Sequence, residues 1–411
     1  MVTLADLEAL DRADPLAGFP ARFALPEGVI YLDGNSLGPL PRATPARLAE
    51  VIGREWGEGL IRSWNAAGWI DLPLRVGAGI ARLIGAAAGS VAVADSTSVN
   101  LFKLLGAALA LRPGRRTILT EQGNFPTDLY IAEGLASFRA AGHRLRSVPA
   151  EQIATALDAD VAVLMLTHVN YRTGAMHDMA ALTRAAHAAG ALVLWDLAHS
   201  AGAVPLDLAA TGADLAVGCG YKFLNGGPGA PAFLYAAPRL HADLRFPITG
   251  WLGHDSPFAF EDSYRPAPGI ARAIVGTPPI LSLAALAVGV ELMLEAPAAP
   301  VREKSLRLFD IFASLVAERC AGHGLRVLTP ADPARRGSQI SLAHAAAYPV
   351  MQALIARGVI GDVRTPDILR FGLTPLTLRY ADLWHAVAAL REVLATGEWQ
   401  AAAFQVRQKV T

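Results

Sequence analysis

Short apolar runs alternate with longer helical patterns through the middle of the chain. "VAVLML" (Val161–Leu166) and "ALVLWD", which ends at Asp196, are continuous apolar runs typical of strands buried on both faces. Between them, "DMAALTRAAHAAG" has a helical period, with Asp178 at its start and Gly190 at its end. "DLAVGCG" (214–220) and "APAFLYA" predict two more strands. Strand, helix and strand at this spacing predict an α/β fold with a mostly parallel sheet and right-handed crossovers.

The pattern changes after Leu294. "EAPAAP" predicts a break, and "VREKSLRLFDIFASLVAERCAGHG" predicts a long amphipathic helix. Single strands are predicted at "LRVLTP", "SQISLAH", "VIGDVR" and "ILRFGLT", with helices at "AAYPVMQALIARG" and "YADLWHAVAALREVLATG". We therefore expect a large domain at residues 46–295, a smaller α+β domain at 296–411, and an N-terminal arm at 1–45 that packs with the small domain.

Composition narrows the classes of function. The chain has 411 residues with 36 basic and 36 acidic side chains, so its formal net charge is zero, which argues against nucleic-acid or anionic-membrane partners. Cys219 and Cys320 provide neither a disulfide framework nor the spacing of a metal site. The start, "MVTLADLEALDRADP", does not resemble a signal peptide, and the apolar "ILSLAALAVGVELML" is too short to span a bilayer. We expect a soluble cytoplasmic protein.

Candidate chemistry lies where the predicted strands end. Asp196 ends one strand, His199 follows it closely, and Lys222 follows another strand. Ligands of such sheets bind at the carboxyl ends of the strands. An acid, a histidine and a lysine there suit pyridoxal phosphate, which needs a lysine for covalent attachment and an acid to keep its pyridine nitrogen protonated. Taken singly, the aspartate can simply cap a turn and the lysine can be a surface residue.

Two further segments suit the rest of such a cofactor. "DSTSVNLFKLLGAALAL" places Ser96, Thr97 and Ser98 at the start of a predicted helix, where free N–H groups attract a phosphate. An ordinary N-cap is the alternative for this segment. "NFPTD" supplies the ring of Phe125 and the carboxylate of Asp128, although by itself it would pass as a loop.

The motifs together resemble the kynureninase family, in the class V aminotransferase branch of the fold type I pyridoxal phosphate enzymes. They appear in the family's order from about Tyr31 to about Leu376. They imply a large domain with a mostly parallel seven-stranded sheet and a smaller α+β C-terminal domain. The Asp-x-x-His pattern is shared with cysteine desulfurases, whereas the "YKFLN" run together with "GWLGH" is more specific to kynureninases. The motifs are "YLDGNSLGPLP", "STSVNLFK", "NFPTD", "THVNYRTG", "WDLAHSAG", "GCGYKFLNGGPG", "GWLGH", "GTPPI" and "LRFGLTPL".

The resemblance implies a role for each matching residue. Lys222 matches the Schiff-base lysine that also acts as a base, and Tyr221 matches a phosphate-bonding tyrosine that is the best candidate for a proton donor. The other implied cofactor contacts are a phosphate-binding pair at Thr97 and Ser98, a stacking ring at Phe125, polar contacts at Asp128 and Thr167, and the pyridinium partner Asp196 with its neighbour His199.

Substrate and partner contacts are implied in the same way. Arg370 matches the arginine that grips the substrate's α-carboxylate, and Asn35 and Ser36 match substrate contacts near the N-terminus. Trp251 and Thr277 match phosphate contacts that the family supplies from the partner subunit. The resemblance therefore implies a homodimer with shared active sites and a small-molecule amino-acid substrate.

The implied reaction is hydrolysis of L-kynurenine to anthranilate and L-alanine in tryptophan catabolism. Two positions depart from the animal members: "GTPP" stands where they resemble "SNPP", and Trp64 stands where they carry a histidine. Both differences leave less polar contact for a ring hydroxyl, which predicts 3-hydroxykynurenine as the weaker substrate. A packed aromatic is the alternative role for Trp64, because Trp56 and Trp69 are near it in the sequence.

Two rival functions remain at this point. The first is another class V enzyme, either a cysteine desulfurase, which needs a nucleophilic cysteine on a mobile loop, or an aminotransferase, which needs a keto-acid acceptor. The second is a non-catalytic binding protein that kept the fold, which the set of Lys222, Asp196, His199 and Arg370 argues against. A purified protein without colour would favour that second rival.

Overall fold

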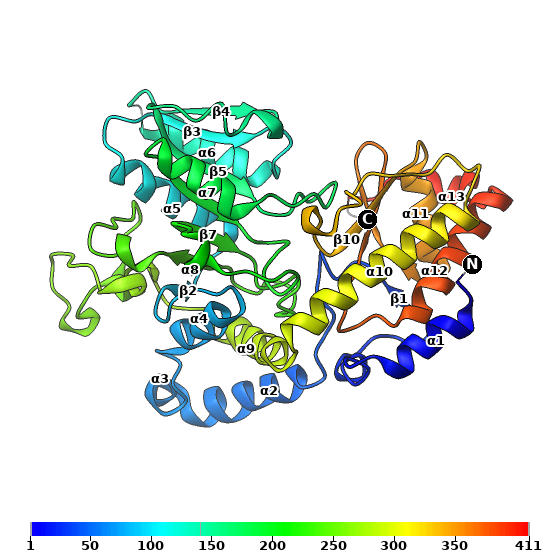
Figure 1. The fold of residues 1–411 in the computed structure, drawn as a ribbon. Helices are drawn as coiled ribbons and strands as arrows, with labels where there is room; N and C mark the ends of the chain where they lie inside the picture. The colour runs from blue at the N-terminus through cyan, green and yellow to red at the C-terminus, as the bar shows by residue number, and fades with distance from the viewer. Residues whose placement is uncertain (1, 140, 410–411) are drawn as a thin grey trace. The chain divides into compact units, whose positions relative to one another are not determined.

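The computed structural model describes residues 2–139 and 141–409 and divides into two compact units (Figure 1). Unit 1 comprises Met1–Ala43, Tyr171–Met176 and Glu295–Thr411, and unit 2 comprises Thr44–Asn170 and His177–Leu294. The arm and the two domains predicted from the sequence stay a prediction.

Unit 2 is built on a seven-stranded sheet with the order β2-β8-β7-β6-β5-β3-β4. Adjacent strands are parallel except at β8, which is antiparallel to both of its neighbours. The mostly parallel α/β sheet predicted from the apolar runs is confirmed. The strands are β2 (Val91–Val93), β3 (Thr117–Glu121), β4 (Arg144–Val148), β5 (Val161–Thr167), β6 (Leu192–Asp196), β7 (Leu215–Gly218) and β8 (Phe233–Ala236).

Helices cover both faces of this sheet, which explains the continuous apolar runs in its central strands. Along β5, Val163 and Met165 pack in one hydrophobic cluster, and Leu164 and Leu166 pack in the other. This alternation is the two-residue period of a strand. One cluster includes α5 (Thr97–Leu111) and α6 (Pro126–Arg139); the other includes α4 (Leu72–Leu83), α7 (Met179–Ala188), α8 (Leu208–Thr211) and α9 (Ile280–Glu295).

Unit 2 also contains elements that the apolar pattern did not predict. α2 (Thr44–Glu50) continues into a π-helix at Val51–Gly59, and α3 (Ser63–Ala66) follows soon after. Short 3₁₀ turns, η6 (Trp251–Gly253) and η7 (Pro257–Ala259), lie in the long connection between β8 and α9.

Unit 1 combines long helices with a four-stranded antiparallel sheet of order β12-β13-β10-β9. A separate parallel pair joins β1 near the N-terminus to β11. The strands are β1 (Ile30–Tyr31), β9 (Arg326–Val327), β10 (Gln339–Ala343), β11 (Val359–Ile360), β12 (Asp362–Arg364) and β13 (Ile368–Gly372). The helices are α1 (Leu4–Ala13), α10 (Ala298–Arg319), α11 (Ala347–Ala356), α12 (Tyr380–Thr396) and α13 (Ala402–Gln405).

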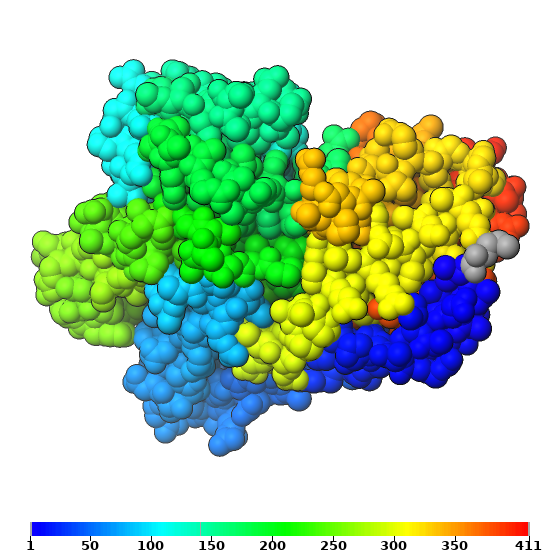
Figure 2. Space-filling view, viewed as in Figure 1, coloured from blue at the N-terminus to red at the C-terminus, as the bar shows by residue number. Residues whose placement is uncertain are grey.

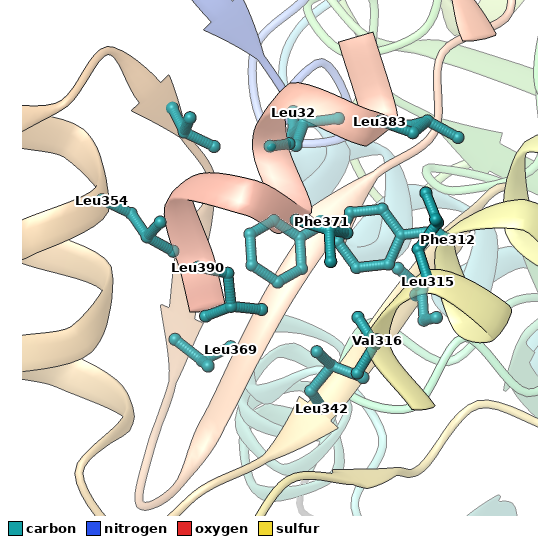
Figure 3. Close-up of a cluster of buried hydrophobic side chains, with 14 of the residues drawn as sticks. Leu32, Phe312, Leu315, Val316, Leu342, Leu354, Leu369, Phe371, Leu383 and Leu390 are labelled. Atoms are coloured by element: carbon teal, nitrogen blue, oxygen red, sulfur yellow. The ribbon is translucent and has the colours of Figure 1, made fainter. Parts of the chain in front are cut away.

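The core of unit 1 lies between its sheet and its helices. Figure 3 shows Phe371 of β13 beside Phe312 of α10, and their ring centroids are 5.2 Å apart. Leu7 of α1 and Leu32, which follows β1, are fully buried in the same cluster. The N-terminal segment is therefore part of this core.

Three details differ from the predicted elements. "VIGDVR" forms two short strands instead of one, because the chain changes partners at Gly361, where an added Cβ would lie 2.9 Å from the carbonyl oxygen of Arg370. The predicted break at "EAPAAP" is shorter, since α10 already begins at Ala298. Cys219, expected inside a strand, lies just beyond the end of β7.

Among the described residues, no single helix is long and apolar enough to cross a membrane, and α9 and α10 meet that length and apolarity only when taken together.

Candidate active site

Polar side chains gather at the carboxyl ends of three neighbouring strands of unit 2. Thr167 is the last residue of β5 and Asp196 is the last residue of β6, and the two are register partners in the sheet. Lys222 follows the end of β7. Because the carboxyl ends of parallel strands meet at one edge, residues far apart in the sequence converge there.

The backbone after β7 makes a tight return around Lys222. The N–H of Gly226 donates to the carbonyl of Gly220 at 2.9 Å, and a Cβ on Gly226 would lie 2.7 Å from that same oxygen. Gly227 and Gly229 have φ angles of 82° and 75°, which favour glycine. The glycines beside the lysine are therefore required by the path of the chain.

Three of the other predicted cofactor residues lie near the side chain of Lys222. Its Nζ lies 3.0 Å from Nε2 of His199, which is buried. The same atom lies 5.8 Å from the ring centroid of Phe125 and 5.9 Å from that of Tyr221. Burial raises the pKa of the Tyr221 phenol above its usual range, so this group keeps its proton at neutral pH.

Two buried carboxyls share this end of the sheet. Asp196 accepts a hydrogen bond from the backbone N–H of Ala198 at 2.7 Å, and Oδ1 of Asp128 is buried and accepts none from the described residues. Burial raises the pKa of both acids, and the charge of Asp196 raises the pKa of Asp128 further. The positive charge of Lys222 opposes these shifts without cancelling them. A site with two buried acids suits an additional cation, which a protonated pyridine nitrogen would supply. These residues therefore fit pyridoxal phosphate.

Asn124 connects two of these residues, Phe125 and Thr167, and was not singled out from the sequence. Its Oδ1 accepts hydrogen bonds from Oγ1 of Thr167 and from the backbone N–H of Phe125, the latter at 2.7 Å. Its Nδ2 donates to Oγ1 of Thr120 at 3.0 Å. Thr167 also approaches Oδ2 of Asp128 at 3.2 Å. Asn124 opens the "NFPTD" motif, but its position in the sequence does not indicate these partners.

The start of α5 has the features expected of a phosphate site. Ser96 is the N-cap residue, and its hydroxyl accepts a hydrogen bond from the N–H of Val99 at 3.4 Å. Thr97 and Ser98 are the first residues of this fifteen-residue helix. The first N–H groups of a helix have no partner within it, and the helix dipole adds positive potential there. The predicted N-cap and the predicted anion site are compatible at this helix start.

Trp251 and Thr277 lie on exposed parts of unit 2. Trp251 is 45% exposed, and its ring stacks on that of Phe260 with the centroids 6.3 Å apart. Figure 2 shows the light-green segment that includes Trp251 and Phe260 protruding from the surface of the unit. Thr277 is exposed just before α9. Their predicted role across a subunit interface stays a prediction.

Trp64 is half-buried in α3. Its ring meets the edge of Trp69 with the centroids 5.8 Å apart, in a small cluster with Val51 and Ala284. This contact matches the packed-aromatic alternative. A substrate role for the remaining face of the ring stays a prediction.

The predicted carboxylate-binding arginine lies in unit 1, where it is almost fully buried. Nε of Arg370 donates to Oδ1 of Asp362 at 2.8 Å, and Nη2 donates to both Oδ2 of Asp362 and Oγ of Ser36. Nη1 donates to the carbonyl of Tyr171 at 2.9 Å. Asp362 faces Arg370 in the register of the β12–β13 hairpin. The sequence did not indicate Asp362, because hairpin register is not visible in the separate strand patterns.

Two more polar residues lie in the same part of unit 1. Asn35 is fully buried, and neither of its side-chain amide atoms bonds to a described residue. Burial and the neighbouring charge of Asp362 raise the pKa of Asp33 to about 7. Arg364 forms an ion pair with Asp362 at 2.7 Å. Unit 1 therefore holds a buried cluster of alternating charges around Ser36.

Comparison with known proteins relates these features to one family. The model of the kynureninase C-terminal domain matches residues 301–390. The chain is 55% identical over 416 residues to the kynureninase of Pseudomonas fluorescens and 54% identical over 417 residues to that of Burkholderia pseudomallei (strain 1106a). Each match covers all of this chain and all of the relative.

Solved structures of more distant proteins share the fold. The cysteine desulfurase of Thermococcus onnurineus NA1 superimposes with a TM-score of 0.77 at 17% identity, covering 92% of this chain and 98% of that one. A C-DES variant with glycine covalently linked to its pyridoxal phosphate cofactor gives a TM-score of 0.78, also at 17% identity and with the same coverage. At such low identity these similarities concern the fold, and they confirm the fold type I class.

Proposed function

The chain belongs to the kynureninase family, and we propose that it hydrolyses L-kynurenine to anthranilate and L-alanine with pyridoxal phosphate as its cofactor. This is hydrolysis of a carbon–carbon bond in a ketonic substance (EC 3.7.1.3). The observation that carries the proposal is the convergence of Lys222, His199 and Asp196 at one sheet edge, in a chain similar over its full length to kynureninases.

The cofactor site that we propose uses both the sheet edge and α5. Lys222 would hold the cofactor covalently, Asp196 would pair with its pyridine nitrogen, and Phe125 would contact its ring. Thr97 and Ser98 bind the phosphate at the helix start, where N–H groups and the dipole favour an anion. Tyr221 adds a phosphate contact, while His199, Thr167 and Asp128 complete the polar surroundings. Bound pyridoxal phosphate supplies the electron sink that this chemistry requires.

Three side chains handle protons in this proposal. Lys222 removes the proton from Cα of the substrate, a task for which its partly buried position beside the His199 ring suits it. Asp196 holds a proton on the pyridine nitrogen, since a buried carboxylate without a cationic partner is costly. Tyr221 donates a proton because burial keeps its phenol protonated. In the overall reaction, water adds to the γ-carbonyl carbon and the bond between Cβ and Cγ breaks. Cγ then leaves as the carboxyl group of anthranilate, and Cβ takes up a proton to become the methyl group of alanine.

The α-carboxylate of the substrate is assigned to Arg370. Asp362 fixes the plane of this guanidinium by pairing with Nε and Nη2, which leaves part of Nη1 available for the ligand. Ser36 shares Nη2, and Asn35 brings a buried amide with unused hydrogen-bonding capacity. Asn35 and Ser36 are proposed as further substrate contacts.

We propose that two copies of the chain form a homodimer in the cytoplasm. The support is an exposed aromatic group, with Trp251 45%, Phe258 62% and Phe260 74% exposed. Exposed aromatic groups of this kind commonly mark interaction surfaces. Trp251 and Thr277 would then reach the phosphate of the partner's cofactor, as the family resemblance implies.

The alternatives are less well supported. A desulfurase needs an accessible thiolate, but both cysteines are buried. Burial raises the pKa of Cys219 and raises that of Cys320 to about 11, which disfavours a thiolate nucleophile at either position. An aminotransferase would need a keto-acid acceptor for turnover, and the full-length relatives named kynureninase do not favour it.

Anthranilate release tests the proposed function. Purified protein supplied with pyridoxal phosphate and L-kynurenine, but no keto acid, should release anthranilate and alanine in equal amounts. The release of anthranilate is measured by its fluorescence. Lys222→Ala is the matched control and should release none while still binding the cofactor through its phosphate. Turnover that depends on an added keto acid would identify an aminotransferase, and sulfide release from cysteine would identify a desulfurase.

A further inference from the structure

A buried lysine lies on the helix whose start is the proposed phosphate site. Lys103 belongs to α5, and its side chain is 0% exposed. Its Nζ lies 2.5 Å from Oδ2 of Asp95 and donates to the carbonyl of Ala273 at 2.7 Å. Burial lowers the pKa of this ammonium, and the hydrogen bond with Asp95 opposes that shift. Fully buried lysines are rare, so this one needs a structural or functional reason.

The two partners of Lys103 lie in different segments of unit 2, one at the start of α5 and one shortly before Thr277. Asp95 directly precedes Ser96, the N-cap of α5, and it has a φ of 51°, which few residues other than glycine adopt. Its carbonyl accepts a hydrogen bond from the N–H of Ala232 at 2.9 Å, which holds the backbone at this point. Ala273 begins the short run that leads to Thr277. Lys103 therefore links the residue before the proposed phosphate site of its own chain to the segment that leads to Thr277, which is proposed to reach the partner's cofactor.

The charge of Asp95 gives Lys103 a second task. A carboxylate beside a helix start is favourable on its own, but it repels a phosphate that binds at the same place. Asp95 is only partly exposed, with 27% of its side chain accessible, so solvent screens its charge incompletely. The ammonium of Lys103 neutralises this carboxylate from inside the protein.

We propose that Lys103 is a positioning residue for the cofactor's phosphate, which neutralises Asp95 and ties the start of α5 to the segment ending at Thr277. The proposal rests on the proposed function, because it takes the start of α5 as the phosphate site. Lys103 does not touch the reacting atoms, so its removal changes how tightly the phosphate is held and leaves the attachment at Lys222 intact.

The test compares two ligands that differ only in the phosphate group. Apoenzyme of the parent and of Lys103→Met is titrated with pyridoxal phosphate and with pyridoxal, and the dissociation constants are read from the absorbance of the bound cofactor. Lys103→Met should bind pyridoxal phosphate about tenfold or more weakly, the scale of placing an unpaired charge near a like charge, and pyridoxal nearly as the parent does. The double variant Asp95→Asn, Lys103→Met should recover most of the loss, because the unpaired carboxylate is gone.

Lys304 provides a matched control in unit 1. Its side chain is 2% exposed and pairs with Asp14 at 2.6 Å, so Lys304→Met also breaks a buried ion pair. This variant should lose stability while its affinity for pyridoxal phosphate stays within about twofold of the parent. Two results would contradict the proposal. Lys103→Met could lose affinity equally for pyridoxal phosphate and for pyridoxal, or Lys304→Met could lose as much affinity for pyridoxal phosphate as Lys103→Met does. Either result would mean that Lys103 contributes only to general stability.

Asp95→Asn provides a second test that does not require Lys103→Met to fold. If Lys103→Met does not fold, the single variant Asp95→Asn decides. This variant should bind pyridoxal phosphate with an affinity within about threefold of that of the parent, or more tightly. A tenfold weaker affinity for pyridoxal phosphate, with the affinity for pyridoxal unchanged, would overturn the proposal. A parent that binds pyridoxal phosphate and releases anthranilate retains the proposed function whatever Lys103→Met shows.

Discussion

Single residues at the sheet edge carry the proposed chemistry, and Asp196 is the sharpest test among them. Asp196→Asn keeps nearly the same shape and can still accept the hydrogen bond from Ala198. An amide cannot hold a proton on a pyridine nitrogen, so kcat should fall on the order of a hundredfold or more, as when one electrostatic catalytic contact is removed. The measurement is anthranilate release with saturating cofactor. Activity within a few-fold of the parent would remove Asp196 from this role.

Asp33 makes stability depend on pH. Its pKa in the folded protein is about 7 because it is buried beside Asp362, whereas an unfolded aspartate titrates near 3.9. A raised pKa means that the folded state favours the protonated acid. Its contribution to the free energy of unfolding is full below about pH 4 and is lost as the pH rises through 7.

Asp33→Asn should therefore stabilise the protein above pH 7, by on the order of 4 kcal/mol, with little effect at pH 4. Urea unfolding at several pH values measures this difference. Asp6→Asn is the matched control, because Asp6 is fully exposed and its pKa is lowered by its hydrogen bonds with Thr3. A gain for Asp33→Asn that is independent of pH would mean that the carboxyl has the same pKa in the folded and unfolded states.

Substrate choice is expected to depend on Trp64. The indole lacks the polar partner that a histidine would offer to a ring hydroxyl, and burying an unpaired hydroxyl costs roughly 1–3 kcal/mol. At about 1.4 kcal/mol per factor of ten, kcat/KM for kynurenine should exceed that for 3-hydroxykynurenine roughly five- to hundredfold. Trp64→His should narrow the ratio. Equal values for the two substrates on the parent would refute the prediction, and so would an unchanged ratio in a folded Trp64→His.

Site residues on strand ends were predictable from the sequence, whereas their partners were not. Asp196 and Lys222 follow continuous apolar runs, and such runs become parallel strands whose carboxyl ends converge. Asn124, Asp362 and Lys103 act through tertiary hydrogen bonds. No local pattern encodes those contacts, because they depend on strand register and on how a helix lies against its neighbours.

At the scale of elements, a side chain of α1 caps the N-terminus of α12. Oδ1 of Asp11 accepts the N–H of Tyr380 at 2.6 Å, and Oδ2 accepts that of Ala381 at 3.1 Å. A helix cap is thus supplied from a segment distant in sequence. Asp11→Ala should lower the free energy of unfolding by about 1–2 kcal/mol. Glu8→Ala, an exposed position on the same helix, should change it by less than about 0.5 kcal/mol in urea unfolding. Equal effects would show that the cap contributes nothing.

Elements with a clear hydrophobic pattern were predictable from the sequence. Elements that depend on a change of strand partner or on an irregular helix were not. β5 and α7 match their predicted ranges closely, since an apolar run and a capped helical period are local signals, and the side chain of Asp178 caps α7 as expected. The pattern of "VIGDVR" predicts one strand, because the change of partner at Gly361 depends on the separate strands β1 and β13. The π-helix at Val51–Gly59 has no composition signal that separates it from an ordinary helix.

For the whole molecule, the homodimer is the proposal with the widest consequence. Phe258 and Phe260 join Trp251 in an exposed aromatic group, and a soluble monomer rarely leaves large apolar patches uncovered. A shared site would also explain why residues outside the sheet edge, such as Thr277, match cofactor contacts of the family.

Complementation between two inactive variants tests the shared site. Lys222→Ala lacks the attachment point, and the double variant Trp251→Ala, Thr277→Ala lacks the contacts proposed to come from the partner. If each site takes its lysine from one chain and these contacts from the other, a hybrid dimer contains one site with both parts intact. Random exchange at equal concentrations makes half of the dimers hybrid, so about a quarter of the parent's anthranilate release should return. No recovery, with exchange between differently tagged chains confirmed by pull-down, would show that each chain completes its own site.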